Sequence, residues 1–185
     1  MKLTNYAKLT LSAVASLALV ALPAATASAA TQTANSTITA NISEVITLAV
    51  SGNVNINATP GGGVATGSHN VTVSTNNSTG YNLSLASSAS ETTLAKGADS
   101  INAATAPFAT PAALTADTWG YRVDSFTANN YAGIVSNSTT APVIKSSTVP
   151  ATNEVTPVTW GVNVTATKPT GAYSRVVTYT AVTRP

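Results

Sequence analysis

From Thr37 onward, most of the chain alternates between apolar and polar positions. A period of two places every second side chain on the same face of a β-strand, so this pattern predicts strands. The lack of a 3.6-residue period and the abundance of Thr, Val and Asn disfavour helix. The first alternating series occupies even-numbered positions, interrupted only by Glu44: Ile38, Ala40, Ile42, Ile46, Leu48 and Val50.

Two pairs of alternating runs are each separated by turn-forming residues, and each pair predicts a β-hairpin. The runs are residues 71–75 and 81–85, separated by 76–80, and residues 158–166 and 173–182, separated by 168–171. Shorter alternating segments at 54–58, 119–123 and 143–144 add further strand candidates. A total of about seven to ten short strands predicts an all-β fold, a single Ig-like or jelly-roll β-sandwich.

Residues 87–117 interrupt this regularity. They are rich in Ala, Ser and Thr and contain Pro107 and Pro111. We expect a long irregular connection within the sandwich, and connections of this length are often functional.

The N-terminus has the pattern of a secretory signal. Lys2 and Lys8 precede an almost wholly apolar stretch, and Ala27-Ser28-Ala29 provides small residues for cleavage. We therefore expect residues 1–29 to be a cleaved signal peptide and residues 30–185 to be one exported domain, at the cell surface, in the cell wall or released. After the signal there is no apolar run of about 18 residues, so no membrane span is expected in the mature chain.

Composition excludes several kinds of chemistry. The chain has no cysteine and a single histidine, His69, so thiolate metal sites, a cysteine nucleophile and a histidine-rich metal site are not available. Eight basic residues face six acidic ones, and removing Lys2 and Lys8 leaves six of each. A mature charge of zero argues against a nucleic-acid partner. The acids are spread singly, so we predict no catalytic residue, metal site or cofactor, and no enzyme.

The only two tryptophans lie in segments that echo each other. Residues 118–123 and 159–164 share the pattern Thr-Trp-Gly-x-x-Val. The interpretation that we prefer buries both indoles, with each glycine allowing another part of the chain to approach closely. In the alternative, Trp119, Trp160 and Tyr81 are exposed platforms on which a sugar ring stacks.

The alternating segment from Thr37 to Val50 is a candidate for strand exchange. Its polar face carries little charge, and charge is what usually protects a strand edge from pairing with another chain. The segment is predicted either to form an ordinary first strand, which we prefer, or to be donated to another protomer through main-chain pairing.

The chain contains two short motifs, Tyr81-Asn82-Leu83 and Trp160-Gly161-Val162. With the alternating strands, they give it a resemblance to secreted Ig-like surface proteins of bacteria, and a more distant one to the WxL cell-wall domains. Compared with the WxL pattern, Tyr replaces the first Trp and Val replaces the final Leu. Membership of the WxL family would imply non-covalent attachment to the cell wall. The end of the chain also resembles the last strand of spore-coat and pilus-type subunits.

These observations favour a non-catalytic secreted protein that serves as an adhesive or structural module on a bacterial surface. One alternative is a module that binds carbohydrate or peptidoglycan, and another is a self-assembling pilus or fibre subunit. The expected partners are a cell-wall or surface glycan, another surface protein, or a second copy of the chain.

Overall fold

The structure is a computed structural model that describes residues 29–185. Apart from Ala29, the expected signal peptide lies outside the described residues. The chain divides into two units, Met1–Ala40 and Asn41–Pro185. The described residues of the first unit, 29–40, are exposed and contain no strand or helix.

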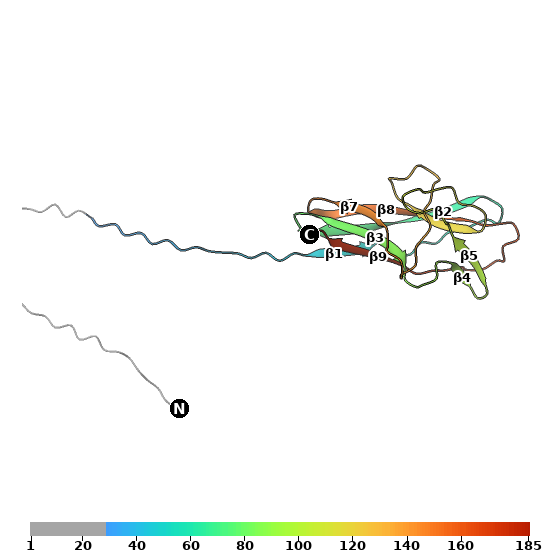
Figure 1. Cartoon of the computed structure of the whole chain (residues 1–185), viewed down its shortest axis with the longest axis horizontal. Helices are drawn as coiled ribbons and strands as arrows, with labels where there is room; N and C mark the ends of the chain where they lie inside the picture. Colours follow the sequence, from blue (N-terminus) through green and yellow to red (C-terminus); the bar gives the residue numbers. More distant parts are fainter. Residues whose placement is uncertain (1–28) are drawn as a thin grey trace, which may run out of the picture. The chain divides into compact units, whose positions relative to one another are not determined.

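The second unit is built from β-strands, and the part of the chain that the structure describes contains no helix (Figure 1). This confirms the predicted all-β fold, and the nine strands fall within the predicted range. They are β1 (Ile46–Val50), β2 (Val64–Thr75), β3 (Tyr81–Ser87), β4 (Leu94–Lys96), β5 (Asp99–Ala103), β6 (Thr118–Arg122), β7 (Val143–Ser147), β8 (Ala151–Asn163) and β9 (Val177–Thr183).

The strands form two sheets of unequal width that make a β-sandwich. The large sheet has six strands in the order β1-β2-β8-β6-β5-β4, and the small sheet has three in the order β7-β3-β9. All neighbouring pairs are antiparallel except β5 and β6. Because the large sheet has three more strands than the small sheet, part of its inner face must be covered by loops or left open.

The core lies between the sheets and is formed by the alternating rows that the sequence predicts. Adjacent inward positions on β2, β3 and β8 are fully or almost fully buried: Val71, Val73, Leu83, Leu85, Val158, Trp160 and Val162. Residues 54–58 form no strand, but Val54, Ile56 and Ala58 still pack against this core.

Both predicted hairpins are wrong in their pairing, although their strands exist. β2 pairs with β1 and β8, whereas β3 pairs with β7 and β9, so residues 76–80 connect one sheet to the other. In the same way, β8 belongs to the large sheet and β9 to the small sheet. A turn between two alternating runs is compatible with two strands that pair in one sheet and also with two strands that belong to opposite sheets. In both cases here the two strands lie in opposite sheets, and their inward rows point toward the core.

The connection 87–117 is more ordered than its composition predicts. It contains β4 and β5, which pair with each other through three residues each. Its remaining part, residues 104–117, has no strand longer than a single bridge between Ala112 and Tyr131. Alternation is not detectable here, because β4 has only three residues and β5 contains a single strongly apolar residue, Ile101.

Candidate functional site

The aromatic residues proposed as sugar platforms are all buried. Trp119 is 3% exposed, Trp160 is 5% exposed and Tyr81 is fully enclosed. The two indoles stack on each other between the sheets, with ring centroids 5.4 Å apart. The structure therefore matches the burial interpretation, and none of the three rings presents a face to a ligand. The reason is their position in the inward rows of β6, β8 and β3, whose alternation turns them away from solvent.

The glycines that follow the two tryptophans explain the repeated pattern. Gly120 and Gly161 lie directly opposite each other in the pairing of β6 with β8. Because Trp119 and Trp160 point inward, these glycines face outward. A Cβ on Gly161 would lie 2.5 Å from Cε1 of Tyr131, and a Cβ on Gly120 would lie 2.5 Å from the carbonyl oxygen of Ala132. The two glycines thus leave room for a second layer on the outer face of the large sheet.

This second layer is a small hydrophobic cluster outside the sandwich. Tyr131 and Leu114 are both buried, and Leu114 is also close to the position that a Cβ on Gly161 would take. The main chain of Ala132 exchanges hydrogen bonds with Tyr121 of β6, at 2.9 and 2.8 Å. The loops that carry Leu114 and Tyr131 are therefore anchored to the sheet.

His69, the only histidine, serves as an internal link. Its Nδ1 lies 2.9 Å from the carbonyl oxygen of Gly52, and its Nε2 lies 2.6 Å from the hydroxyl of Tyr179. A carbonyl oxygen only accepts, so Nδ1 carries the proton and Nε2 accepts from Tyr179. Burial raises the pKa of Tyr179, which keeps that hydroxyl protonated as a donor. The imidazole thereby ties β2 to β9 and to the loop after β1.

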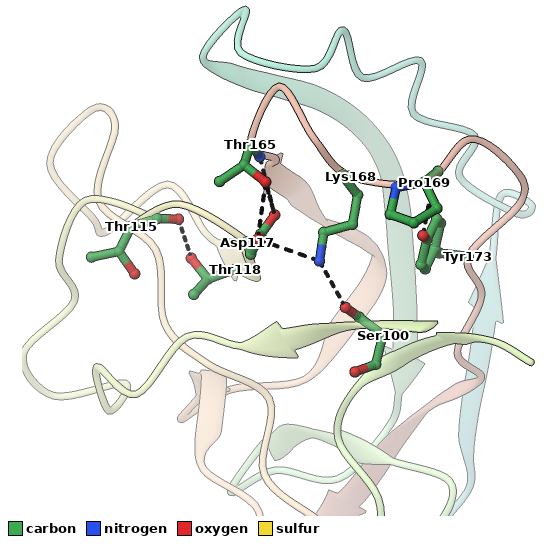
Figure 2. Close-up of polar contacts among 8 residues, drawn as sticks. All are labelled: Ser100, Thr115, Asp117, Thr118, Thr165, Lys168, Pro169 and Tyr173. Carbon is green, nitrogen blue, oxygen red and sulfur yellow. Dashed lines mark hydrogen bonds and ion pairs between the residues drawn. The ribbon is translucent and has the colours of Figure 1, made fainter. Parts of the chain in front are cut away.

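Several polar side chains converge around Asp117, the residue directly before β6 (Figure 2). The Asp117 carboxylate accepts hydrogen bonds from the backbone N–H of Thr165, at 3.0 Å, and from its hydroxyl, at 3.1 and 3.2 Å. Lys168 approaches the same carboxylate at 3.4 Å and donates to the carbonyl oxygen of Ser100 at 3.1 Å. Three segments far apart in sequence are joined here.

The electrostatics of this cluster suit a structural clasp. The backbone N–H of Thr165 holds the pKa of Asp117 below its usual range, and the Thr165 hydroxyl and Lys168 act in the same direction. A general acid would need the opposite shift, because it must hold a proton near neutral pH.

Two further acids are also engaged: Asp99 pairs with Lys96 and Glu154 pairs with Lys145, both at 3.0 Å. Among residues 29–185, no three acidic or histidine side chains gather into a group that would hold a metal ion.

A shallow hollow lies outside the core, beside the loops that follow β5 and β6. It measures about 400 Å³ and is lined by Phe108, Phe126 and Asn130, among others. The Phe108 ring contacts that of Phe126, with centroids 5.0 Å apart, and stacks on Tyr121 at 6.5 Å. Sequence reasoning missed this place because its two phenylalanines lie in separate irregular segments that show no periodicity.

The edge strands β1 and β9 belong to different sheets, and two apolar side chains of β1 are partly exposed. These edge strands of the two sheets lie near each other. Leu48 and Val50 share the parity of the inward row of β1, yet they are 37% and 43% exposed. On β9, Tyr179 and Ala181 are only partly buried. Apolar positions that a wider small sheet would cover are therefore accessible here.

Comparisons of the chain with protein-family models, with curated proteins and with solved structures gave no match. The two segments that carry the resemblance to the WxL domains lie on β3 and β8, in opposite sheets. Tyr81, Leu83, Trp160 and Val162 are all buried, so these segments supply core side chains. In the described part of the chain, no helix has the length and apolar character needed to cross a membrane.

Proposed function

We propose that the mature chain is a non-catalytic module exposed on a bacterial surface, with an adhesive or structural role. The observation that carries this proposal is that the side chains suited to acid–base chemistry are engaged in holding the fold together. The Asp117 carboxylate fastens the loop at Thr165, and the His69 imidazole links β2 to β9. Groups that hold the fold together in this way are not free to shuttle protons or attack a substrate.

The surface supports the same conclusion. The outward positions of β2, β9 and the segment before β1 are mainly Thr, Ser and Asn, and few charged residues interrupt them. Such a surface forms neutral hydrogen bonds and suits contact with polysaccharide or with another uncharged polypeptide. The resemblance to the WxL domains adds non-covalent retention on the cell wall as the first partner to test.

The experiment is to incubate the mature chain, residues 30–185, with purified bacterial cell wall. Both the protein retained by the wall and the soluble sugar or peptide released from it are measured. We expect retention without release, and the same result with the Asp117→Asn variant. Release that disappears in Asp117→Asn would show that the protein is a hydrolase, and a failure of retention would overturn attachment to the wall.

A second candidate function is favoured by the hollow at Phe108 and Phe126. Aromatic rings beside a few polar groups are typical of small-ligand sites, and Asn130 and Ser125 supply amide and hydroxyl groups at the rim. A carbohydrate would stack on the rings and hydrogen-bond to these groups. Glycan-array binding that is lost in Phe126→Ala and kept in Thr180→Ala, a substitution on the exposed face of β9, would support this function.

A further inference from the structure

We infer that the hollow at Phe108 and Phe126 continues into a second hollow that carries a negative charge, and that the two together bind an amino sugar. The sugar ring stacks on Phe126 while its ammonium group pairs with Asp124. This inference rests on the second candidate function proposed above, and it narrows the ligand from carbohydrate in general to glycans with free amino groups.

The second hollow adjoins the first. It measures about 130 Å³ and lies between β7, β8 and the residues that follow β6, with Asp124 and Lys145 among its lining residues. Ser125 lines both hollows, so they meet at this residue. The larger hollow falls within the range of roughly 300–1,000 Å³ that is typical of small-molecule sites, and the smaller one has room for a polar group with bound water. A ligand that lies over the phenylalanines therefore has a second compartment within reach.

The residues between the two hollows form a β-turn. The N–H of Phe126 donates to the carbonyl oxygen of Val123 at 3.0 Å, and Asp124 and Ser125 lie at the exposed corner. Both ends of the turn are anchored, because the Val123 side chain is buried in the core and the Phe126 ring packs against Phe108. The main chain that carries Asp124 is thus positioned before a ligand arrives, which lowers the entropic cost of binding.

The charge that remains without a partner in the second hollow is negative. Among the described residues that line this hollow, Lys145 is the one cation, and Glu154 pairs with it at 3.0 Å. The Asp124 carboxylate makes no ion pair with any described residue. The residues that line the first hollow are all uncharged. A ligand with a positive group at Asp124 would balance the charge, whereas an anionic ligand would be repelled.

The short separation of Asp124 and Phe126 favours a charge that is carried on the stacking ring itself. The two residues are two positions apart, so their Cα atoms are separated by no more than about 7 Å. In an amino sugar the ammonium nitrogen is bonded directly to the ring, so a single sugar unit reaches both side chains. In a basic peptide the lysine ammonium ends a flexible four-carbon stem, and ordering this stem costs entropy.

The rim of the first hollow suits the rest of the sugar. Thr127 supplies a hydroxyl group and Asn130 supplies an amide, which both donates and accepts hydrogen bonds. Sugar hydroxyl groups also donate and accept, so they match these partners. The ring face and the hydroxyl groups are common to amino sugars and to their N-acetylated forms. Discrimination between the two forms therefore depends on Asp124.

The expected contribution of Asp124 is modest, because its side chain is exposed to water. An exposed ion pair changes an equilibrium constant by up to about fivefold. We therefore expect the chain to prefer the amino form of a glycan over its N-acetylated form by about two- to fivefold. This preference should shrink as the salt concentration rises, since salt screens the attraction between exposed charges.

The test measures binding of the mature chain to two β-linked glucosamine hexamers, one fully N-acetylated and the other with all of its amines free. Isothermal titration calorimetry is carried out at about pH 6, where free amines are protonated. Asp124→Asn removes the charge and keeps the size of the side chain. Glu44→Gln is the matched control, because it removes the same charge at an exposed position that lines neither hollow. We expect the unaltered chain and Glu44→Gln to prefer the amino form, and Asp124→Asn to bind both hexamers equally.

A second variant, Asp124→Lys, places a like charge opposite the ammonium group and should reverse the preference; circular dichroism first establishes that each variant is folded. Equal affinity of the unaltered chain for the two hexamers, or a preference that survives in Asp124→Asn, would refute the inference and leave carbohydrate binding in place. Binding to neither hexamer would count against carbohydrate binding itself, and the inference would fall with it. Binding of trilysine but of neither hexamer would assign the hollows to a basic peptide and overturn the inference.

Discussion

Gly161→Ala tests whether the second layer on the large sheet depends on its paired glycines. The added Cβ would lie 2.5 Å from Cε1 and 2.8 Å from Cζ of Tyr131, closer than carbon atoms approach in folded proteins. Tyr131 is buried, and the Ala132 main chain next to it is hydrogen-bonded to Tyr121. The ring therefore has little freedom to move aside, and the strain must reach the loop or the sheet.

The expected cost follows from measurements on overpacked interiors. An extra methyl group in a well-packed core destabilises by about 1–3 kcal/mol. For a domain of about 150–250 residues, each kcal/mol lowers the Tm by about 2–4 °C. Gly161→Ala should therefore lower the Tm by about 2–12 °C. Thr159→Ala, two residues away on the same outward row, is the matched control and should change stability by less than about 0.5 kcal/mol.

Urea unfolding followed by tryptophan fluorescence provides the assay, because Trp119 and Trp160 are both buried in the native state. The decisive measurement is a double-mutant cycle with Tyr131→Ala. Removal of the ring alone should cost about 3–5 kcal/mol. In that background Gly161→Ala fills empty space, so its cost should vanish or change sign, which gives a coupling energy of at least about 1 kcal/mol.

Two results would refute this reasoning. If Gly161→Ala costs the same with and without the Tyr131 ring, the two residues are independent and the glycine does not serve the second layer. If Gly161→Ala leaves the midpoint of unfolding unchanged in the otherwise unaltered chain, the loop that carries Tyr131 is not held against the sheet.

Three further predictions concern other contacts. Asp117 has a folded-state pKa below the 3.8 of an unperturbed carboxyl, so its stabilisation is present above that pH and is lost as the pH falls through the folded-state pKa. Thermal unfolding at a series of pH values should therefore show a weaker acid dependence in Asp117→Asn. Asp124→Asn is the control and should show no such change, because the Asp124 carboxylate makes no hydrogen bond or ion pair with any described residue. His69→Phe leaves the partly buried Tyr179 hydroxyl without its partner and should cost about 1–3 kcal/mol, part of which Tyr179→Phe should restore in the double variant. Gly80→Ala meets the main chain of Ser147 and a φ of 81°, so its Tm, measured by circular dichroism, should fall further than that of Gly161→Ala.

The candidate sites show where sequence reasoning stops. Trp119 and Trp160 were correctly placed in the core because they lie on regular alternating rows. Phe108 and Phe126 have no such row, and only the folded loops bring their rings to 5.0 Å from each other. The Asp117 cluster is equally invisible in the sequence, since its partner Thr165 lies 48 residues away.

Alternation along the chain was enough to establish that the protein is all-β and which side chains face the core. The reason is that the direction of a side chain in a strand depends only on the local backbone, which repeats every two residues. The choice of neighbouring strand belongs to the tertiary structure. β2 and β3 lie in opposite sheets, as do β8 and β9, and the inward rows of all four strands contribute to the core between the sheets. The same packing decided that β9 remains an edge and that β1 is left partly uncovered.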